Sequence, residues 1–266
     1  MVRRLGVASI VESAGHVLKW KEVQDLTKIE PPVRVCRALE EMGPTFVKVG
    51  QILASRSDLF SPEWLKEFKK LQDQVQTVPY AELIAQVEED LGAKPEEIFA
   101  EFSYQPIAAA SMSQVYKARL HDGRDVIVKI RRPGIRSVVE ADLRLLAQLA
   151  GIAEQEITVL QRYRPKEIVH QFTLSMRREL DLAAECRNAE RMMANFAEDA
   201  NIVFPKVYWQ WTSERINVQE FIAGIPGNNI DAVEQAGLDR KLLAKRGVEA
   251  VLKMILEDGF FHADPH

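Results

Sequence analysis

The sequence of 266 residues has few cysteines and no excess of basic side chains. Its two cysteines, Cys36 and Cys186, form no Cys-x-x-Cys pair, so the sequence indicates neither a zinc site nor a disulfide framework. Two isolated cysteines fit a reducing compartment. The 35 Lys and Arg residues are outnumbered by 39 Asp and Glu residues, which gives a net charge of −4. Because nucleic-acid-binding proteins usually show the opposite balance, we expect no nucleic-acid partner.

Long hydrophobic runs are also missing. The longest, Leu145 to Ala153, is interrupted by Gln148 and is far shorter than the ~20 residues that a helix needs to cross a bilayer. Near the N-terminus, an apolar run over residues 5–11 ends at Glu12, which favours a short amphipathic helix over a signal peptide. An apolar content of 47% and a charged content of 28% are typical of a soluble globular protein.

The first 100 residues are expected to be helical, because proline and glycine punctuate them at helix boundaries. We expect helices that start at residues 30–32, run over 45–56, open at Ser61-Pro62 and cover 80–91.

After residue 100 the pattern changes to strands. Two β-rich runs, 115–120 and 126–130, flank a turn at Asp122-Gly123 and predict a hairpin. Residues 133–198 are expected to form two helices divided near Arg164-Pro165, followed by a second strand pair at 203–210 and 215–221 and a last amphipathic helix over 239–258.

This order of elements predicts an α+β fold of the protein-kinase type. Residues 1–100 would be a helical extension, 101–223 an N-lobe with a small antiparallel sheet, and 224–266 the start of a helical C-lobe.

Residues 260–266 read as the first half of a kinase-type catalytic loop. In His-x-Asp-x-x-x-x-Asn phosphotransferases, the Asp takes or orients the proton of the acceptor, and the Asn and a later Asp hold magnesium. Asp264 occupies the position of that base. The expected metal ligands would follow His266, so no metal-binding residue is assigned within the sequence.

Lys129 ends the apolar strand 126–129. Its ammonium is expected to reach the α- and β-phosphates of a nucleotide while its stem stays packed. The alternative is a lysine on an edge strand that points into solvent.

A loop of small residues precedes that hairpin. Small side chains allow main-chain N–H groups to approach phosphates, although alanine disfavours positive φ and makes the loop stiffer than a glycine-rich one. A tight turn packed against a neighbour is the alternative. The residues expected to bind nucleotide here are Ile107, Ala108, Ala109, Ala110, Ser111, Met112, Ser113, Gln114 and Val115.

Three acids lie in the helical region after Pro165: Glu179, Asp181 and Glu185. One of them is expected to restrain Lys129 as the helix-C glutamate of a kinase does. Glu179 and Asp181 are about 200° apart on an ideal helix, so they face one site only if the helix bends or begins there. A solvated acidic face is the alternative.

Lys48, Gln51 and Ser55 form a narrow polar stripe on an otherwise apolar helix. Such a helix is expected to be buried, and a buried lysine needs an anionic partner. We therefore expect Lys48 and Gln51 to lie near Glu179 or Asp181. The alternative is an amphipathic helix with Lys48 on its wet side.

Together these residues resemble the UbiB family of atypical protein-kinase-like proteins. Residues 48–51 match its Lys-x-Gly-Gln motif, 108–111 its alanine-rich loop, 179–181 its Glu-x-Asp motif, and 262–266 the start of its catalytic loop. Glu185 matches its helix-C glutamate, which implies that Glu185 restrains Lys129. The resemblance covers residues 30 to 266.

The resemblance implies binding of ATP or ADP with Mg²⁺ and a role in ubiquinone biosynthesis as an ATPase or a small-molecule or lipid kinase. It implies association with the cytoplasmic face of the bacterial inner membrane, with quinone-pathway lipids or enzymes as partners. Lys48, Gln51, Glu179 and Asp181 would then form a gate, in which the helical extension folds over the nucleotide site. We expect residues 1–266 alone to lack magnesium-dependent ATPase activity and to leave the apolar side of the last helix exposed.

Two other functions are compatible with parts of the pattern. A non-catalytic pseudokinase module would bind a lipid or a partner and use nucleotide as a conformational signal. A small-molecule kinase related to choline or aminoglycoside phosphotransferases would share the His-x-Asp loop, but the Lys-x-Gly-Gln motif counts against it.

Overall fold

The computed structural model describes residues 30–58, 60–71 and 77–262. The chain divides into two compact units, each of which is described by itself. Unit 1 contains residues 1–87, 104–116 and 129–181, and unit 2 contains residues 88–103, 117–128 and 182–266. The amphipathic helix expected at residues 5–11 lies outside the described residues. The domain limits expected near residues 101 and 224 stay a prediction.

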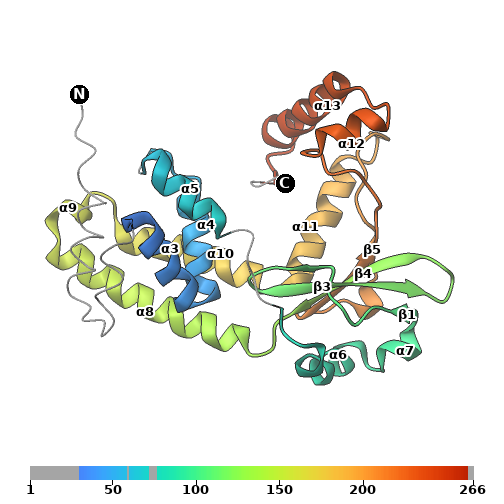
Figure 1. Ribbon diagram of the computed structural model, residues 1–266, viewed down its shortest axis with the longest axis horizontal. Coiled ribbons are helices and arrows are strands. Elements are labelled where there is room, and N and C mark those ends of the chain that lie inside the picture. The colour runs from blue at the N-terminus through green and yellow to red at the C-terminus, as the bar shows by residue number, and fades with distance from the viewer. Residues whose placement is uncertain (1–29, 59, 72–76, 263–266) are drawn as a thin grey trace. The chain divides into compact units, whose positions relative to one another are not determined.

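Unit 1 begins with three short helices that pack on one another (Figure 1). Each has a proline in its first turn, where a missing N–H costs no hydrogen bond. Their shared core contains Cys36, Leu39, Phe68 and Leu71. The helices expected from the sequence are confirmed as α3 (Pro31–Met42), α4 (Pro44–Ala54) and α5 (Pro62–Lys70). The expectation that α4 is buried is correct only in part, because Thr45, Gly50 and Ala54 alone are buried among its residues.

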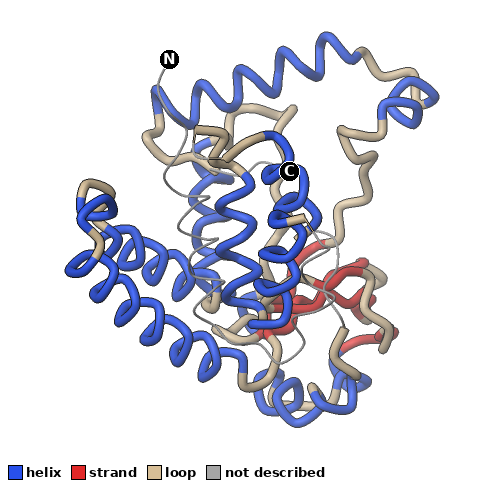
Figure 2. The backbone as a smooth tube through the Cα atoms, turned by 60° about the vertical axis from the view of Figure 1, so that its left-hand side comes forward, coloured by secondary structure: helices blue, strands red, loops and turns tan. Residues whose placement is uncertain are grey.

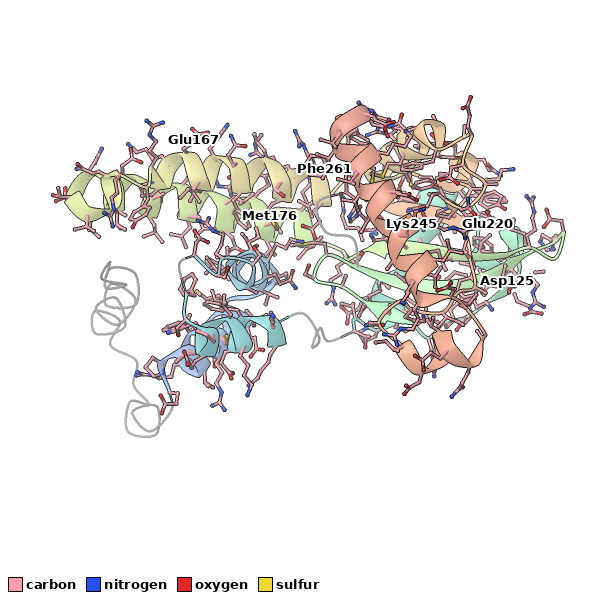
Figure 3. All side chains as sticks on the ribbon, turned by 90° about the horizontal axis from the view of Figure 1, so that it is seen from above. Asp125, Glu167, Met176, Glu220, Lys245 and Phe261 are labelled. Carbon is pink, nitrogen blue, oxygen red and sulfur yellow. The ribbon has the colours of Figure 1, made fainter. Side chains whose placement is uncertain are left out.

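Two long helices of unit 1 lie side by side (Figures 1 and 2). They are α8 (Ile135–Glu156) and α10 (Pro165–Glu179), with the short α9 (Thr158–Gln161) between them in the chain. Val139 and Leu143 of α8 pack with Met176 of α10 in a second core. Figure 3 labels Met176 and the exposed Glu167 on opposite sides of α10.

The sheet has five strands in the order β1-β3-β4-β5, with β2 paired to β3. β1 and β2 both run antiparallel to β3, with Phe102 opposite Ala118 and Ala108 opposite Val115. Gly123 has a φ of 87° at the turn between β3 and β4, which confirms the hairpin predicted there. The bounds are β1 (Phe99–Phe102), β2 (Ala108–Ala109), β3 (Ser113–Leu120), β4 (Asp125–Arg131) and β5 (Ile216–Glu220).

The remaining elements are short apart from two helices of unit 2. Asp239 caps the last helix by accepting hydrogen bonds from the N–H groups of Lys241 and Leu242, and the expected helix over 239–258 is confirmed with a π-helical last turn. The bounds are η1 (Tyr80–Glu82), α6 (Ile84–Leu91), α7 (Pro95–Ile98), α11 (Leu182–Asn195), η2 (Trp209–Trp211), α12 (Ile230–Gln235), α13 (Arg240–Leu252) and η3 (Lys253–Glu257).

The core of unit 2 joins α11 to the end of this last helix. Met192, Phe196 and Met254 are its buried members, and Phe260 packs against them. On α13 and η3, as expected, a row of apolar side chains is exposed: Val248, Val251, Leu252 and Ile255. Among the residues that the structure describes, no helix combines the length and apolar character that a membrane crossing requires.

The strand predicted at residues 203–210 is wrong. Residues around Val207 form only an isolated bridge to Gln219, and the chain then turns through η2. Pro205 lacks the N–H group that a continuous ladder needs, which limits this segment to isolated hydrogen bonds. The α+β class itself is confirmed.

Gly50 allows the helices of the extension to approach closely. A Cβ atom added there would lie 2.2 Å from Cδ1 of Leu71 and 3.0 Å from Cδ1 of Leu39. Both leucines belong to the core of the extension, so they have little room to move.

We therefore expect Gly50→Ala to lower the free energy of unfolding by about 1–2 kcal/mol, because overpacking outweighs the better helix propensity of alanine. Gly151→Ala in α8 is the matched control, since its Cβ would meet only Cε of Lys166 at an ordinary 3.7 Å. Denaturant unfolding followed by circular dichroism measures both. Equal stability of the two variants would contradict the packing role.

Candidate functional site

The Lys-x-Gly-Gln helix reaches the Glu-x-Asp segment through one ion pair. Nζ of Lys48 in α4 donates to Oε1 of Glu179 at the end of α10, at 2.8 Å and across 131 residues of sequence. The two side chains are 27% and 33% exposed, so water screens the pair only in part. The predicted contact between Lys48 and the acids at 179–181 is confirmed.

A second long-range hydrogen bond fixes the start of the same helix. The hydroxyl of Thr45, which is fully buried, donates to Oδ2 of Asp142 in α8 at 2.6 Å. Thr45 and Lys48 lie three residues apart and therefore on one side of α4. α4 is thus held to α8 at its first turn and to α10 one turn later.

Gln51 makes a different contact from the one expected. Its Nε2 donates to the main-chain carbonyl oxygen of Leu71 at 3.2 Å, at the C-terminus of α5. That carbonyl is one of those left without a partner where a helix ends. Gln51 therefore holds α5 against α4 within the extension.

The Glu-x-Asp segment is a junction between two helices. The prediction of one helix through residues 179–185 is wrong, because α10 ends at Glu179 and α11 begins at Leu182. Nη1 of Arg131 donates to the carbonyl oxygen of Leu180 at 2.6 Å, and both residues are buried. Arg131 thereby stabilises the junction, because it satisfies a buried carbonyl oxygen at the point where the helix breaks.

The break supplies the bend that Glu179 and Asp181 require in order to face one site. Asp181 lies in the junction, where its N–H donates to the carbonyl oxygen of Arg178. Glu185 lies in the first turn of α11, within unit 2, whereas Lys129 belongs to unit 1. The expected pairing of Glu185 with Lys129 stays a prediction.

The alanine loop forms a tight hairpin between β2 and β3. The N–H of Ala110 donates to the carbonyl oxygen of Ser113 at 2.8 Å, and the N–H of Ile107 donates to that of Val115 at 2.8 Å. Ile107, Ala108 and Ala110 are exposed, whereas residues 111–114 are buried. Among the described residues, Arg164 is the only non-glycine with positive φ, so the loop has the stiff conformation expected of alanine.

The tip of this hairpin is anchored in the core of unit 1. Met112 packs with Ile135, Val139 and Met176, and its carbonyl oxygen accepts a hydrogen bond from the N–H of Arg132 at 2.9 Å. The alternative of a tight turn packed against a neighbour therefore describes residues 111–114. Within residues 107–115, only Ile107, Ala108 and Ala110 are exposed to meet a ligand.

Gln114 holds a neighbouring segment against the loop. Its fully buried amide accepts from the N–H of Val78, donates to the carbonyl oxygen of Val78 at 3.0 Å and donates to the hydroxyl of Tyr116 at 2.7 Å. Burial raises the pKa of the Tyr116 phenol, which the hydrogen bond from Gln114 partly offsets. The side-chain amide of Gln114 therefore makes its hydrogen bonds within the fold.

Lys129 lies on the less buried side of β4. Along this strand Asp125, Ile127 and Lys129 are half-buried, and Val128 and Ile130 between and after them are fully buried. β4 has β3 on one side and β5 on the other, so the alternative of an edge-strand lysine is wrong.

The catalytic-loop position and the metal ligands are not tested by this geometry. Asp264 lies outside the described residues. Within residues 30–58, 60–71 and 77–262, no cluster of three or more His, Cys, Asp or Glu side chains is arranged to hold a metal ion.

Sequence reasoning missed Thr45, Asp142 and Arg131. Thr45 appeared only as the start of a helix, and its partner is 97 residues away. Arg131 is 49 residues from Leu180 and carries no local signal beyond its place at the end of an apolar strand.

We expect Arg131→Met to lower the free energy of unfolding by about 1–3 kcal/mol, because the carbonyl of Leu180 would lose this buried partner. Arg119→Met, which removes an exposed arginine of β3, should change stability little. Urea unfolding of the two variants tests the difference. If Arg131→Met and Arg119→Met have the same free energy of unfolding, the junction forms without this hydrogen bond.

Comparison with known proteins places these motifs in a family. Residues 70–266 match the ABC1 atypical kinase-like domain. The chain is 37% identical over 257 residues to a protein of Azotobacter vinelandii named "Probable protein kinase UbiB", covering 96% of this chain and 48% of that protein. It is 41% identical over 233 residues to the protein of the same name from Marinobacter nauticus, covering 88% and 43%.

A solved structure is also similar. It is titled "The complex structure of Rv3197-erythromycin from Mycobacterium tuberculosis", with a TM-score of 0.50 and 25% identity over 68% of this chain and 46% of that chain. The chain spans about half the length of the curated relatives it matches.

Proposed function

Because this chain belongs to the UbiB family of ABC1 atypical kinase-like proteins, we propose that it binds ATP or ADP and serves ubiquinone biosynthesis as part of an ATPase or a small-molecule or lipid kinase. The ion pair between Lys48 and Glu179 supports this proposal most strongly. It joins two of the motifs that distinguish the family from ordinary kinases, in one small region of unit 1.

In this proposal the nucleotide phosphates lie against the exposed part of the alanine loop. Main-chain N–H groups of Ala108 and Ala109 and the ammonium of Lys129 hold them, and Glu185 restrains the lysine. Asp264 takes the position of the base that orients an acceptor. Magnesium, when bound, neutralises charge on the phosphates, and its ligands are not among the residues assigned here.

In this proposal the ion pair also lets the extension limit which acceptors reach the nucleotide site. Lys48 and Glu179 keep α4 beside the end of α10, while Gln51 keeps α5 beside α4. A gate built in this way would exclude bulky acceptors such as proteins and favour small molecules or lipids. The names of the relatives support a kinase-like activity, and we extend to this chain a place at the cytoplasmic face of the inner membrane, with quinone-pathway lipids or enzymes as partners.

A non-catalytic nucleotide switch is the second candidate. The anchored tip of the loop favours it, since Met112 sits in the core and the loop has little freedom to follow a phosphate during transfer. Turnover separates the candidates: a switch binds nucleotide without consuming it.

Lys129→Met is the test of the nucleotide site. We expect at least about a tenfold loss of affinity for ATP and ADP, because a charge-assisted contact to the phosphates would be removed. Titration calorimetry on the chain measures the two affinities. Lys94→Met is the control, because Lys94 is an exposed lysine at the N-cap of α7. Parental affinity of Lys129→Met for both nucleotides would contradict the assignment.

Ala109→Gly tests the loop. Glycine reaches positive φ, so we expect the loop of the variant to follow the phosphates more closely. The ratio of ATP affinity to ADP affinity should change by roughly a few-fold. Competition binding with both nucleotides gives the ratio. An unchanged ratio would mean that the loop only turns the chain.

A further inference from the structure

A groove on the surface of unit 1 lies between α8 and α10. It encloses about 410 Å³, a volume within the range of small-ligand sites. Leu143, Ala147 and Val169 supply apolar surface along it, and charged or polar side chains rise on both sides. All of its lining residues belong to unit 1.

Ion pairs close both ends of the groove. Arg177 of α10 holds Glu140 of α8 through two hydrogen bonds of 2.8 and 2.9 Å. Lys166 of α10 lies 3.7 Å from a carboxylate oxygen of Glu154 in α8. The two pairs also show that the helices run antiparallel, since the early part of α8 meets the late part of α10.

The middle of the groove is different. Arg144 projects from α8 and His170 from α10, with Thr173 beside them. Within the described part of the chain, neither Arg144 nor His170 forms an ion pair with a carboxylate. Arg144 therefore brings a positive charge to the middle, while Glu140, the acid that lines the groove, is engaged by Arg177.

The pKa of Glu140 is consistent with positive charge around the groove. The hydrogen bonds from Arg177 lower the pKa of its carboxyl group, and the charges of Arg136 and Arg144 lower it further. Within the lining of the groove, one carboxylate thus faces the guanidinium groups of Arg144 and Arg177, so the groove has capacity for another anion.

We propose that this groove binds a phosphate-bearing anion between Arg144 and His170, with the apolar part of the ligand on Leu143, Ala147 and Val169. Guanidinium and imidazole N–H groups are donors suited to phosphate oxygens. The phosphate could be free in solution or belong to the headgroup of an acidic phospholipid. This site is separate from the alanine loop and does not depend on the proposed nucleotide function.

The test uses the whole chain and two probes, inorganic pyrophosphate and phosphatidylcholine vesicles with or without phosphatidylglycerol. The ring resonances of His170, assigned with His170→Gln among the five histidines, report binding at this groove and not at the alanine loop. We expect a saturable shift, and for Arg144→Gln a loss of affinity of about tenfold or more. Arg37→Gln, an equal change of charge at an exposed position of α3, should bind like the parent.

The outcomes are distinct. A shift with pyrophosphate identifies free phosphates as ligands. A shift only with phosphatidylglycerol vesicles, together with loss of cosedimentation for Arg144→Gln, identifies a lipid headgroup. No saturable shift with either probe overturns the site, and so does equal weakening by Arg37→Gln, which would indicate nonspecific attraction.

Discussion

The hydrogen bond from Arg131 to the carbonyl oxygen of Leu180 decides where the long helical region is interrupted. In a continuous helix that carbonyl would accept from the N–H four residues later. Arg131 donates to it at 2.6 Å, and the side chain of Leu180 is fully buried, so this hydrogen bond and the burial stabilise the break at this position. Because α10 must end there, Glu179 stands in its last turn, where Lys48 of α4 reaches it.

The same strand organises the other parts of the site. Four consecutive residues at the end of β4 and beyond it supply Lys129 to the half-buried side of the sheet, Arg131 to the helix junction and the N–H of Arg132 to the tip of the alanine loop. A shift of this strand would therefore move the lysine, the loop and the acidic junction together. Such coupling would let the proposed nucleotide site and the extension influence each other.

Local chemistry explains which elements the sequence could predict. Prolines in first turns, a glycine at positive φ between β3 and β4 and the cap at Asp239 act within a few residues, and those predictions are confirmed. The helix junction depends on a partner 49 residues away, and the burial of Met112 depends on two distant helices. Neither leaves a local pattern. The strand predicted at 203–210 is wrong because Pro205 has no N–H group for a strand ladder, in spite of the apolar residues around it.

The residues of the Lys-x-Gly-Gln motif have two different roles: packing within the extension and a contact outside it. Gly50 and Gln51 both hold Leu71 at the end of α5. Gly50 leaves space for its side chain, and Gln51 donates a hydrogen bond to its carbonyl oxygen. Lys48 alone reaches outside the extension, to Glu179. In the proposed gate, a change at Gly50 or Gln51 would act on nucleotide access only through the packing of the extension, and it would lower stability as well. A change at Lys48, whose pair is partly exposed, would release α4 from Glu179 while leaving that packing in place.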